Sequence, residues 1–259
     1  MQEELLFCPL GGSGEIGMNM NLFAYGKPDN QKWIMVDIGV TFADDSLPGI
    51  DLIYPDPGFI IDKKDDLLGI VLTHAHEDHI GAIAHIWPQI KCKIFSTPFT
   101  AVLIKEKFKE KRIDIGNNLK IVDLNGKVNL HPFNIEFITL THSILEPNGL
   151  RIETPAGVIL HTGDWKVDPN PLIGGKINSD TRLYILMGSE YSASRSSWIR
   201  SKTLSVVVLT ISEGPFGVAK TFMANATIIH VKVCPRSRFI VKKSLLPADI
   251  VMGAPFLEL

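Results

Sequence analysis

The feature that most constrains this sequence is a dense group of metal-ligating side chains directly after an apolar run. Residues 69–73 read as a buried strand, and the next six residues contain three histidines and two carboxylates. Imidazole and carboxylate groups are ligands of borderline divalent metals such as zinc. A loop that leaves the strand can turn His74 and His76 to one side, and Asp78 and His79 to the other. This arrangement predicts two adjacent metals, whereas a solvated loop with incidental histidines would not need such density.

Further ligands are expected at the ends of later strands. His142 follows the predicted strand 137–141, and Asp164 follows the predicted strand 158–161. Both stand just past an apolar run, so they can meet the first group at one edge of a sheet, and a carboxylate at 164 can bridge two metals. Taken alone, His142 is equally compatible with a surface or core histidine.

One more carboxylate and three more histidines have weaker contexts. Asp37 ends the predicted strand 33–36, where it either holds a ligand histidine by a hydrogen bond or simply forms a strand-end turn. The remaining histidines are interpreted as structural or surface residues, because His161 lies inside a strand, His131 lies beside a proline in a loop, and His85 lies on a helix.

The pattern of apolar runs and turns predicts a mixed α/β (α+β) fold with many hairpins. Short strands are expected at 5–10, 21–25, 33–37, 69–73, 93–96, 134–141, 150–154 and 157–161. A helix is expected at 80–87, ended by Pro88, and another at 98–111 with Pro98 as its first residue. The three prolines between 41 and 62 predict an irregular loop. Strands and helices do not alternate regularly, which argues against a doubly wound sheet.

A glycine-rich segment at residues 12–17 imitates a dinucleotide-binding fingerprint. It fits the pattern GxGxxG after a strand, and Asp37 follows 20 residues after Gly17. The turn at 26–30 comes too soon for the crossover helix that the fingerprint requires. We therefore interpret the segment as a hairpin near the metal edge and expect no nucleotide cofactor.

Several motifs together resemble the metallo-β-lactamase fold, and in particular the N-terminal part of bacterial ribonuclease J. They are the HxHxDH signature at 74–79, the segments 11–19, 37–39 and 49–56, Thr-His-Ser-Ile at 141–144, and Thr-Gly-Asp-Trp-Lys at 162–166. The resemblance covers about residues 5–176 and implies an incomplete αββα sandwich. It implies two zinc ions, with His74, His76 and His142 on one, Asp78 and His79 on the other, and Asp164 between them. Asp78 and His79 are the residues that it implies for catalysis.

The composition changes near residue 180. Residues 1–180 carry 16 basic and 24 acidic side chains, whereas residues 181–259 carry 10 and 4. We therefore expect a metallo-β-lactamase domain at 1–176 and a tail at 177–259 that does not match the β-CASP domain of ribonuclease J. The tail's one histidine, His230, is no convincing match for the late metal ligand of the family, so the tail is interpreted as diverged or frame-shifted.

The resemblance implies hydrolysis of RNA phosphodiesters, as a 5′-exonuclease or endonuclease, by a hydroxide that bridges the metals. Missing family residues predict a poor nuclease. The alternatives are a hydrolase of a small ester or thioester with the same fold, and a metal-binding gene remnant without activity. The stretch 105–112 mixes lysine with glutamate, which is more typical of a solvated helix face than of an RNA track.

Composition adds the expected location and partners. Three widely spaced cysteines argue against a disulfide framework. The N-terminus lacks the pattern of a signal peptide, and the longest apolar run, at 204–211, is too short to span a bilayer. We expect a cytoplasmic protein that binds RNA and no membrane. Exposed sheet edges of an incomplete fold favour a homo-oligomer or another partner chain.

Overall fold

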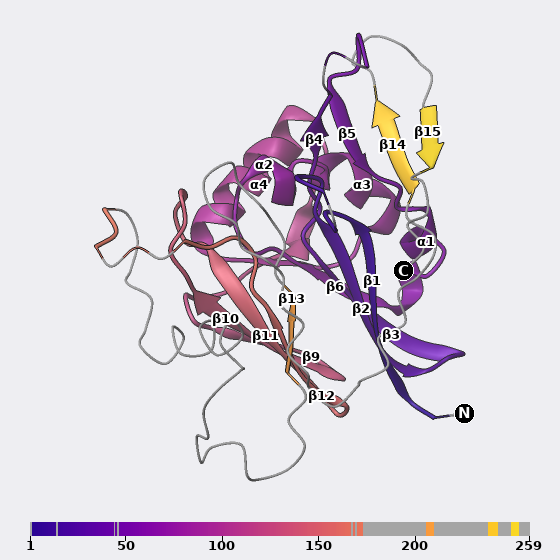
Figure 1. Cartoon of the computed structure of the whole chain (residues 1–259), viewed down its shortest axis with the longest axis vertical. Helices are drawn as coiled ribbons and strands as arrows, with labels where there is room; N and C mark the ends of the chain where they lie inside the picture. Colours follow the sequence, from indigo (N-terminus) through magenta and orange to yellow (C-terminus); the bar gives the residue numbers. More distant parts are fainter. Residues whose placement is uncertain are drawn as a thin grey trace.

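The computed structural model describes residues 2–13, 15–43, 45, 47–166, 168 and 170–172, and the backbone of residues 206–209, 238–242 and 250–253. Two sheets face each other, and helices cover the first of them (Figure 1). The described part of the chain therefore has the α, β and β layers of a metallo-β-lactamase sandwich. The described α-helices all contribute to the first core, so within these residues no helix forms the fourth layer.

The first sheet has the strand order β1-β2-β3-β6-β7-β8. Strand β2 pairs with β1 and β3 in antiparallel fashion, whereas β3, β6, β7 and β8 are parallel neighbours in this order. The bounds are β1 Glu4–Gly11, β2 Met20–Lys27, β3 Asn30–Val36, β6 Leu67–Val71, β7 Ile94–Ser96 and β8 Leu119–Ile121. Because β3 and β6 are parallel neighbours, the residues that follow them meet at the same edge of the sheet.

The second sheet has the order β13-β12-β11-β10-β9. Its bounds are β9 Lys127–Leu130, β10 Phe133–Thr139, β11 Asn148–Thr154, β12 Gly157–His161 and β13 Val206–Leu209. The predicted hairpin at 150–161 is confirmed by the antiparallel pair β11 and β12. Strand β13 pairs in parallel with β12.

A small third sheet has the order β15-β14-β5-β4. Its bounds are β4 Thr41–Phe42, β5 Leu52–Pro55, β14 Arg238–Lys242 and β15 Ile250–Gly253. The prediction of an irregular loop at 41–62 is wrong in part, because β4, β5 and helix α1 (Gly58–Ile61) lie within it. Strand β5 is only four residues long and pairs with β14, far away in the sequence, so local patterns do not reveal it. The other tail residues lie outside the described part.

The remaining helices lie on the outer face of the first sheet. They are α2 Glu77–Ile80, α3 Ile83–Ile90 and α4 Pro98–Glu110, with short 3-10 turns at Lys64–Asp66 and Gly116–Asn118. The prediction that Pro88 ends the helix is wrong, because Pro88 lies inside α3. The helix ends soon afterwards at Ile90, and Lys91 after it has a left-handed backbone, so Pro88 removes only one late hydrogen bond. No described helix is long and apolar enough to cross a membrane.

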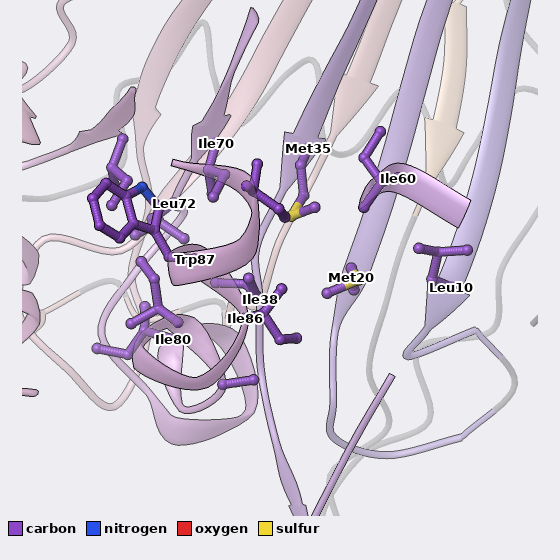
Figure 2. Close-up of a cluster of buried hydrophobic side chains, with 14 of the residues drawn as sticks. Leu10, Met20, Met35, Ile38, Ile60, Ile70, Leu72, Ile80, Ile86 and Trp87 are labelled. Carbon is purple, nitrogen blue, oxygen red and sulfur yellow. The ribbon is translucent and has the colours of Figure 1, made fainter. Parts of the chain in front are cut away.

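Two apolar cores hold the layers together. The first joins the sheet to the helices through residues such as Met35, Ile70, Ile86 and Trp87 (Figure 2). The second lies between the sheets, where side chains of β2, β3 and β6 meet those of β10, β11 and β12. Full burial of one large apolar side chain contributes about 1.5–3 kcal/mol, so the contacts of the second core fix the packing of the two sheets against each other. This packing positions the site.

Candidate metal centre

The predicted metal loop begins where β6 ends, between the two cores. Thr73 and His74 are fully buried, and α2 begins at Glu77, so Asp78 and His79 lie on a helical turn. The second sheet reaches this loop directly, because the backbone and side-chain amides of Asn148 both donate to the carbonyl oxygen of Thr73. The ends of β6 and of the second sheet are therefore fastened together at the metal loop.

The structure brings the six predicted ligands together in two groups. His74, His76, His142 and Asp164 form the first group, and Asp78, His79 and Asp164 form the second. Within each group the candidate ligand atoms all lie within 4.8 Å of one another. Asp164 belongs to both, as a bridging carboxylate would.

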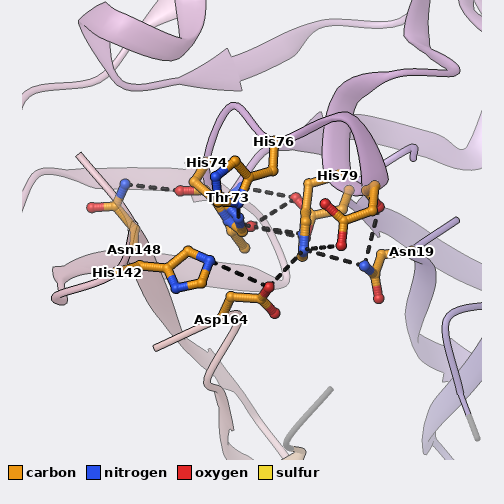
Figure 3. A network of polar contacts seen from close by, with 10 residues as sticks. Asn19, Thr73, His74, His76, His79, His142, Asn148 and Asp164 are labelled. Carbon is orange, nitrogen blue, oxygen red and sulfur yellow. Dashed lines mark hydrogen bonds and ion pairs between the residues drawn. The ribbon is translucent and has the colours of Figure 1, made fainter. Parts of the chain in front are cut away.

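The first group combines loop residues with residues of the second sheet. His74 Nε2 lies 3.1 Å from His76 Nδ1, and His142 Nε2 lies 3.5 Å from Asp164 Oδ2 (Figure 3). The ring of His142 is nearly perpendicular to the rings of His74 and His76. Three imidazoles and one carboxylate converge on one point, and this donor set fits a divalent metal of the zinc class.

The second group surrounds His79. Its Nε2 lies 3.5 Å from Asp78 Oδ2 and 3.5 Å from Asp164 Oδ2. Asp164 reaches this position because Gly163, with a φ of +55°, turns the chain after β12. A Cβ at residue 163 would lie 2.9 Å from the carbonyl oxygen of Asn148, so the tight turn suits glycine.

Asp37 anchors the metal loop by hydrogen bonds. Its side chain is fully buried and accepts hydrogen bonds from the backbone N–H of Thr73 (2.8 Å) and from the Thr73 hydroxyl. It also lies 2.7 Å from His79 Nδ1, which places the proton on that nitrogen and leaves Nε2 toward the second group. The structure thus places Asp37 against a predicted ligand histidine.

Thr73 is a part of this site that the sequence interpretation missed. Its hydroxyl donates to Asp37, so its lone pairs can accept from His74 Nδ1, which lies 3.0 Å away. That contact leaves His74 Nε2 free to face the first group. Asp37 therefore orients one histidine of each group, His79 directly and His74 through the Thr73 hydroxyl. The only sequence signal for the role of Thr73 is its position between the strand and the motif.

Burial keeps the three histidines of the first group unprotonated. It lowers the pKa of His74 well below the usual range, and the neighbouring rings of His79, His76 and His142 lower it further. Burial also lowers the pKa values of His76 and His142, although nearby carboxylates partly oppose it. Neutral imidazoles are the form that binds metals, so protons compete weakly for this group at neutral pH.

The second group behaves in the opposite way. Burial would lower the pKa of His79, but Asp37, Asp164 and Asp78 outweigh it and raise that pKa well above the usual range. Burial would raise the pKa of Asp78, yet its contact with His79 makes the net shift downward. The carboxylates that favour a protonated His79 would also favour a metal cation in place of that proton.

The three other histidines of the described part of the chain lie outside the two groups, and His230 lies outside the described residues. His85 stacks on Tyr54 with the ring centroids 5.7 Å apart, and His131 is exposed in its loop. His161 is fully buried at the end of β12, where its ring packs edge-on against Phe23. Its Nδ1 has no hydrogen-bond partner, so charging it there is costly.

We expect His161 to make the fold sensitive to acid. Burial lowers the pKa of His161 to about 4. An unfolded chain takes up this proton below its ordinary pKa of about 6.5, whereas the folded chain resists it, so stability falls as the pH drops from about 6.5 to about 4. The loss amounts to about 3 kcal/mol, by the conversion of a pKa difference to free energy.

Urea unfolding of the metal-free chain at several pH values measures this effect. His161→Gln should flatten the pH dependence of the unfolding free energy relative to the unmodified chain. The same change at the exposed His131 serves as the control for the substitution itself and should cost little unfolding free energy. Equal slopes for His161→Gln and the unmodified chain would contradict the prediction.

Comparison with known proteins adds a family match and a set of relatives. The family model described as the metallo-beta-lactamase superfamily matches residues 21–199. The Ribonuclease J of Sinorhizobium meliloti is 45% identical over 174 residues, which are 66% of this chain and 30% of that protein. The Ribonuclease J of Helicobacter pylori is 39% identical over 179 residues, which are 69% of this chain and 25% of that protein. This chain therefore spans less than a third of the length of these relatives.

A solved structure also matches over part of its length. The metallo-beta-lactamase fold protein YhfI from Bacillus subtilis is 15% identical, with 65% of each chain covered and a TM-score of 0.44.

Proposed function

Because this chain belongs to the metallo-β-lactamase superfamily, we propose that it is a zinc-dependent hydrolase of RNA phosphodiesters. The observation that carries the proposal is the pair of ligand groups that share Asp164. The choice of RNA as substrate and partner is supported by the similarity to Ribonuclease J proteins. The proposal includes action as a 5′-exonuclease or endonuclease. The proposed location is the cytoplasm.

The proposed metals are two zinc ions, one in each ligand group. When bound, such ions supply positive charge for a phosphate and a nucleophilic hydroxide at neutral pH. The protein's part is to present neutral imidazoles at His74, His76 and His142, an ionised carboxylate at Asp78 and the shared carboxylate of Asp164. Asp37 keeps the proton of His79 on Nδ1, so that Nε2 faces the second group.

The second group has the smaller number of candidate ligands. Among the described residues it has three members, whereas the first group has four. Catalytic zinc sites commonly keep three protein ligands and one open position. We therefore assign the reacting phosphate to the second group, beside Asp78 and His79.

A substrate comparison tests the proposal. The purified chain, loaded with zinc, is assayed on 5′-monophosphorylated RNA, on an activated phosphodiester and on a chromogenic ester. We expect metal-dependent cleavage of both phosphodiesters in preference to the ester. The rate should be well below that of a full-length relative, because positioning of the substrate supplies many orders of magnitude of rate and most of the relatives' length is missing here.

The Asp78→Ala variant, purified in parallel, controls for contaminating nucleases and should be inactive. Cleavage of the ester alone would favour a different hydrolase with the same fold. No cleavage of any substrate would favour a metal-binding remnant. Either result would overturn the proposed function.

A further inference from the structure

The glycine-rich segment before β2 is fastened directly to the metal loop. The backbone N–H of Asn19 donates to the carbonyl oxygen of Asp78, and the carbonyl oxygen of Asn19 accepts from Gly39. Gly17 and Met18, with φ values of +90° and +41°, turn the chain into this position. The chain that follows the glycine-rich segment therefore places Asn19 beside the second ligand group.

The side chain of Asn19 faces that group. It is 1% exposed, and its Nδ2 lies 3.2 Å from His79 Nε2 and 3.1 Å from the carbonyl oxygen of Asp78 (Figure 3). His79 Nε2 is the atom that would bind a metal. The amide thus lies at the wall of the proposed second metal site.

The orientation of this amide follows from its surroundings. Rotating it by half a turn would place Oδ1 against the carbonyl oxygen of Asp78, and two acceptors would then face each other. In the observed orientation Oδ1 lies on the side of Gly12, where a Cβ would come within 2.2 Å of it. Glycine at position 12 leaves room for the Asn19 side chain, and the carbonyl oxygen of Asp78 sets the direction of its N–H groups.

We propose that Asn19 is a substrate-binding residue, whose side-chain N–H donates a hydrogen bond to a phosphate oxygen of the RNA backbone. This inference rests on the proposed function, from which it takes the class of substrate. An amide nitrogen has no lone pair for a metal, so a cation bound to His79 Nε2 would leave the Asn19 N–H that points toward this atom available for another acceptor. A phosphate oxygen beside that cation is an anionic acceptor for this donor.

The test measures phosphate binding separately from metal binding. The full chain is loaded with cobalt(II), and inorganic phosphate is titrated while the visible absorption of the cobalt is followed. Asn19→Ala should weaken phosphate binding by roughly 10- to 100-fold, as expected for a lost hydrogen bond to a charged group. It should leave the cobalt content unchanged. Asn19→Asp should weaken phosphate binding further, because it replaces the donor with a negative charge.

Asn148 offers a matched control. Its buried amide donates to two backbone carbonyl oxygens, at 3.0 Å from Thr73 and 2.7 Å from Glu146. Asn148→Ala should therefore lower the melting temperature without changing the affinity for phosphate. A loss of phosphate affinity in this variant as large as in Asn19→Ala would show a general effect of loosening the loop and would overturn the inference.

The possible failures are distinguishable. Unchanged phosphate affinity in Asn19→Ala would overturn the role of Asn19 and leave the proposed function intact. Loss of cobalt from Asn19→Ala would show that the residue only supports the metal loop. Absence of cobalt binding, or of phosphate binding, in the unmodified chain would overturn the inference, and the former would also overturn the proposed function.

Discussion

Replacing Asp164 with alanine is expected to lower metal binding in both ligand groups at once. The carboxylate is 8% exposed and is the one residue shared by the two groups. Loss of a mere hydrogen-bond partner of a ligand commonly weakens metal binding by about 10- to 100-fold, so loss of a shared ligand should weaken it more. Titration with cobalt(II), followed by its absorption, measures both sites.

Asp168 is a suitable control for this substitution. It lies four residues later, outside both groups, and forms an ion pair with Lys166 at 3.6 Å. Asp168→Ala should leave cobalt binding unchanged. His142→Ala should weaken only the first group, since His142 belongs to that group alone. Undiminished binding at either group in Asp164→Ala would contradict a shared carboxylate.

Replacing Asp37 with alanine is expected to cost more stability than any exposed charge in this chain. The carboxylate is fully buried and accepts from Thr73 and His79, whose buried donors would lose their partner. Removal of one member of a buried pair typically costs 3–5 kcal/mol, and we expect about this loss in the free energy of unfolding. Urea denaturation of the metal-free chain measures it, and metal affinity should fall as well.

The ion pair between Lys32 and Asp66 provides the comparison. Its atoms lie 2.7 Å apart, as close as those of Asp37 and His79, but both side chains are substantially exposed. Asp66→Ala should therefore cost only about 0–1 kcal/mol. Similar losses for Asp37→Ala and Asp66→Ala would show that Asp37 does not anchor the metal loop.

The sequence reveals the parts of this site that depend on local order. The density of ligands at 74–79 marks the metal loop, and the ends of strands mark His142 and Asp164, because residues that follow strands of the same direction gather at one edge of a sheet. Asp37 is recognisable for the same reason. The structure brings all of these residues to one place.

The parts that escaped prediction depend on contacts between distant segments. Asn19 reaches the site only because left-handed turns fold the glycine-rich segment onto the metal loop, and a sequence pattern does not show where such a turn leads. Strand β5 is short and gains its place by pairing with β14. Thr73 looks like an ordinary strand residue, and its role emerges only when Asp37 and His74 lie on either side of its hydroxyl.

The metal content of the purified chain tests the central claim most directly. The chain is expressed in metal-replete medium, and native mass spectrometry counts the ions that remain bound. The shared carboxylate and the two ligand groups predict one zinc ion per group, with the second held less tightly because it has fewer described ligands. A chain that folds but carries no zinc, or no more than the Asp164→Ala variant carries, would contradict the claim that these residues form a metal centre.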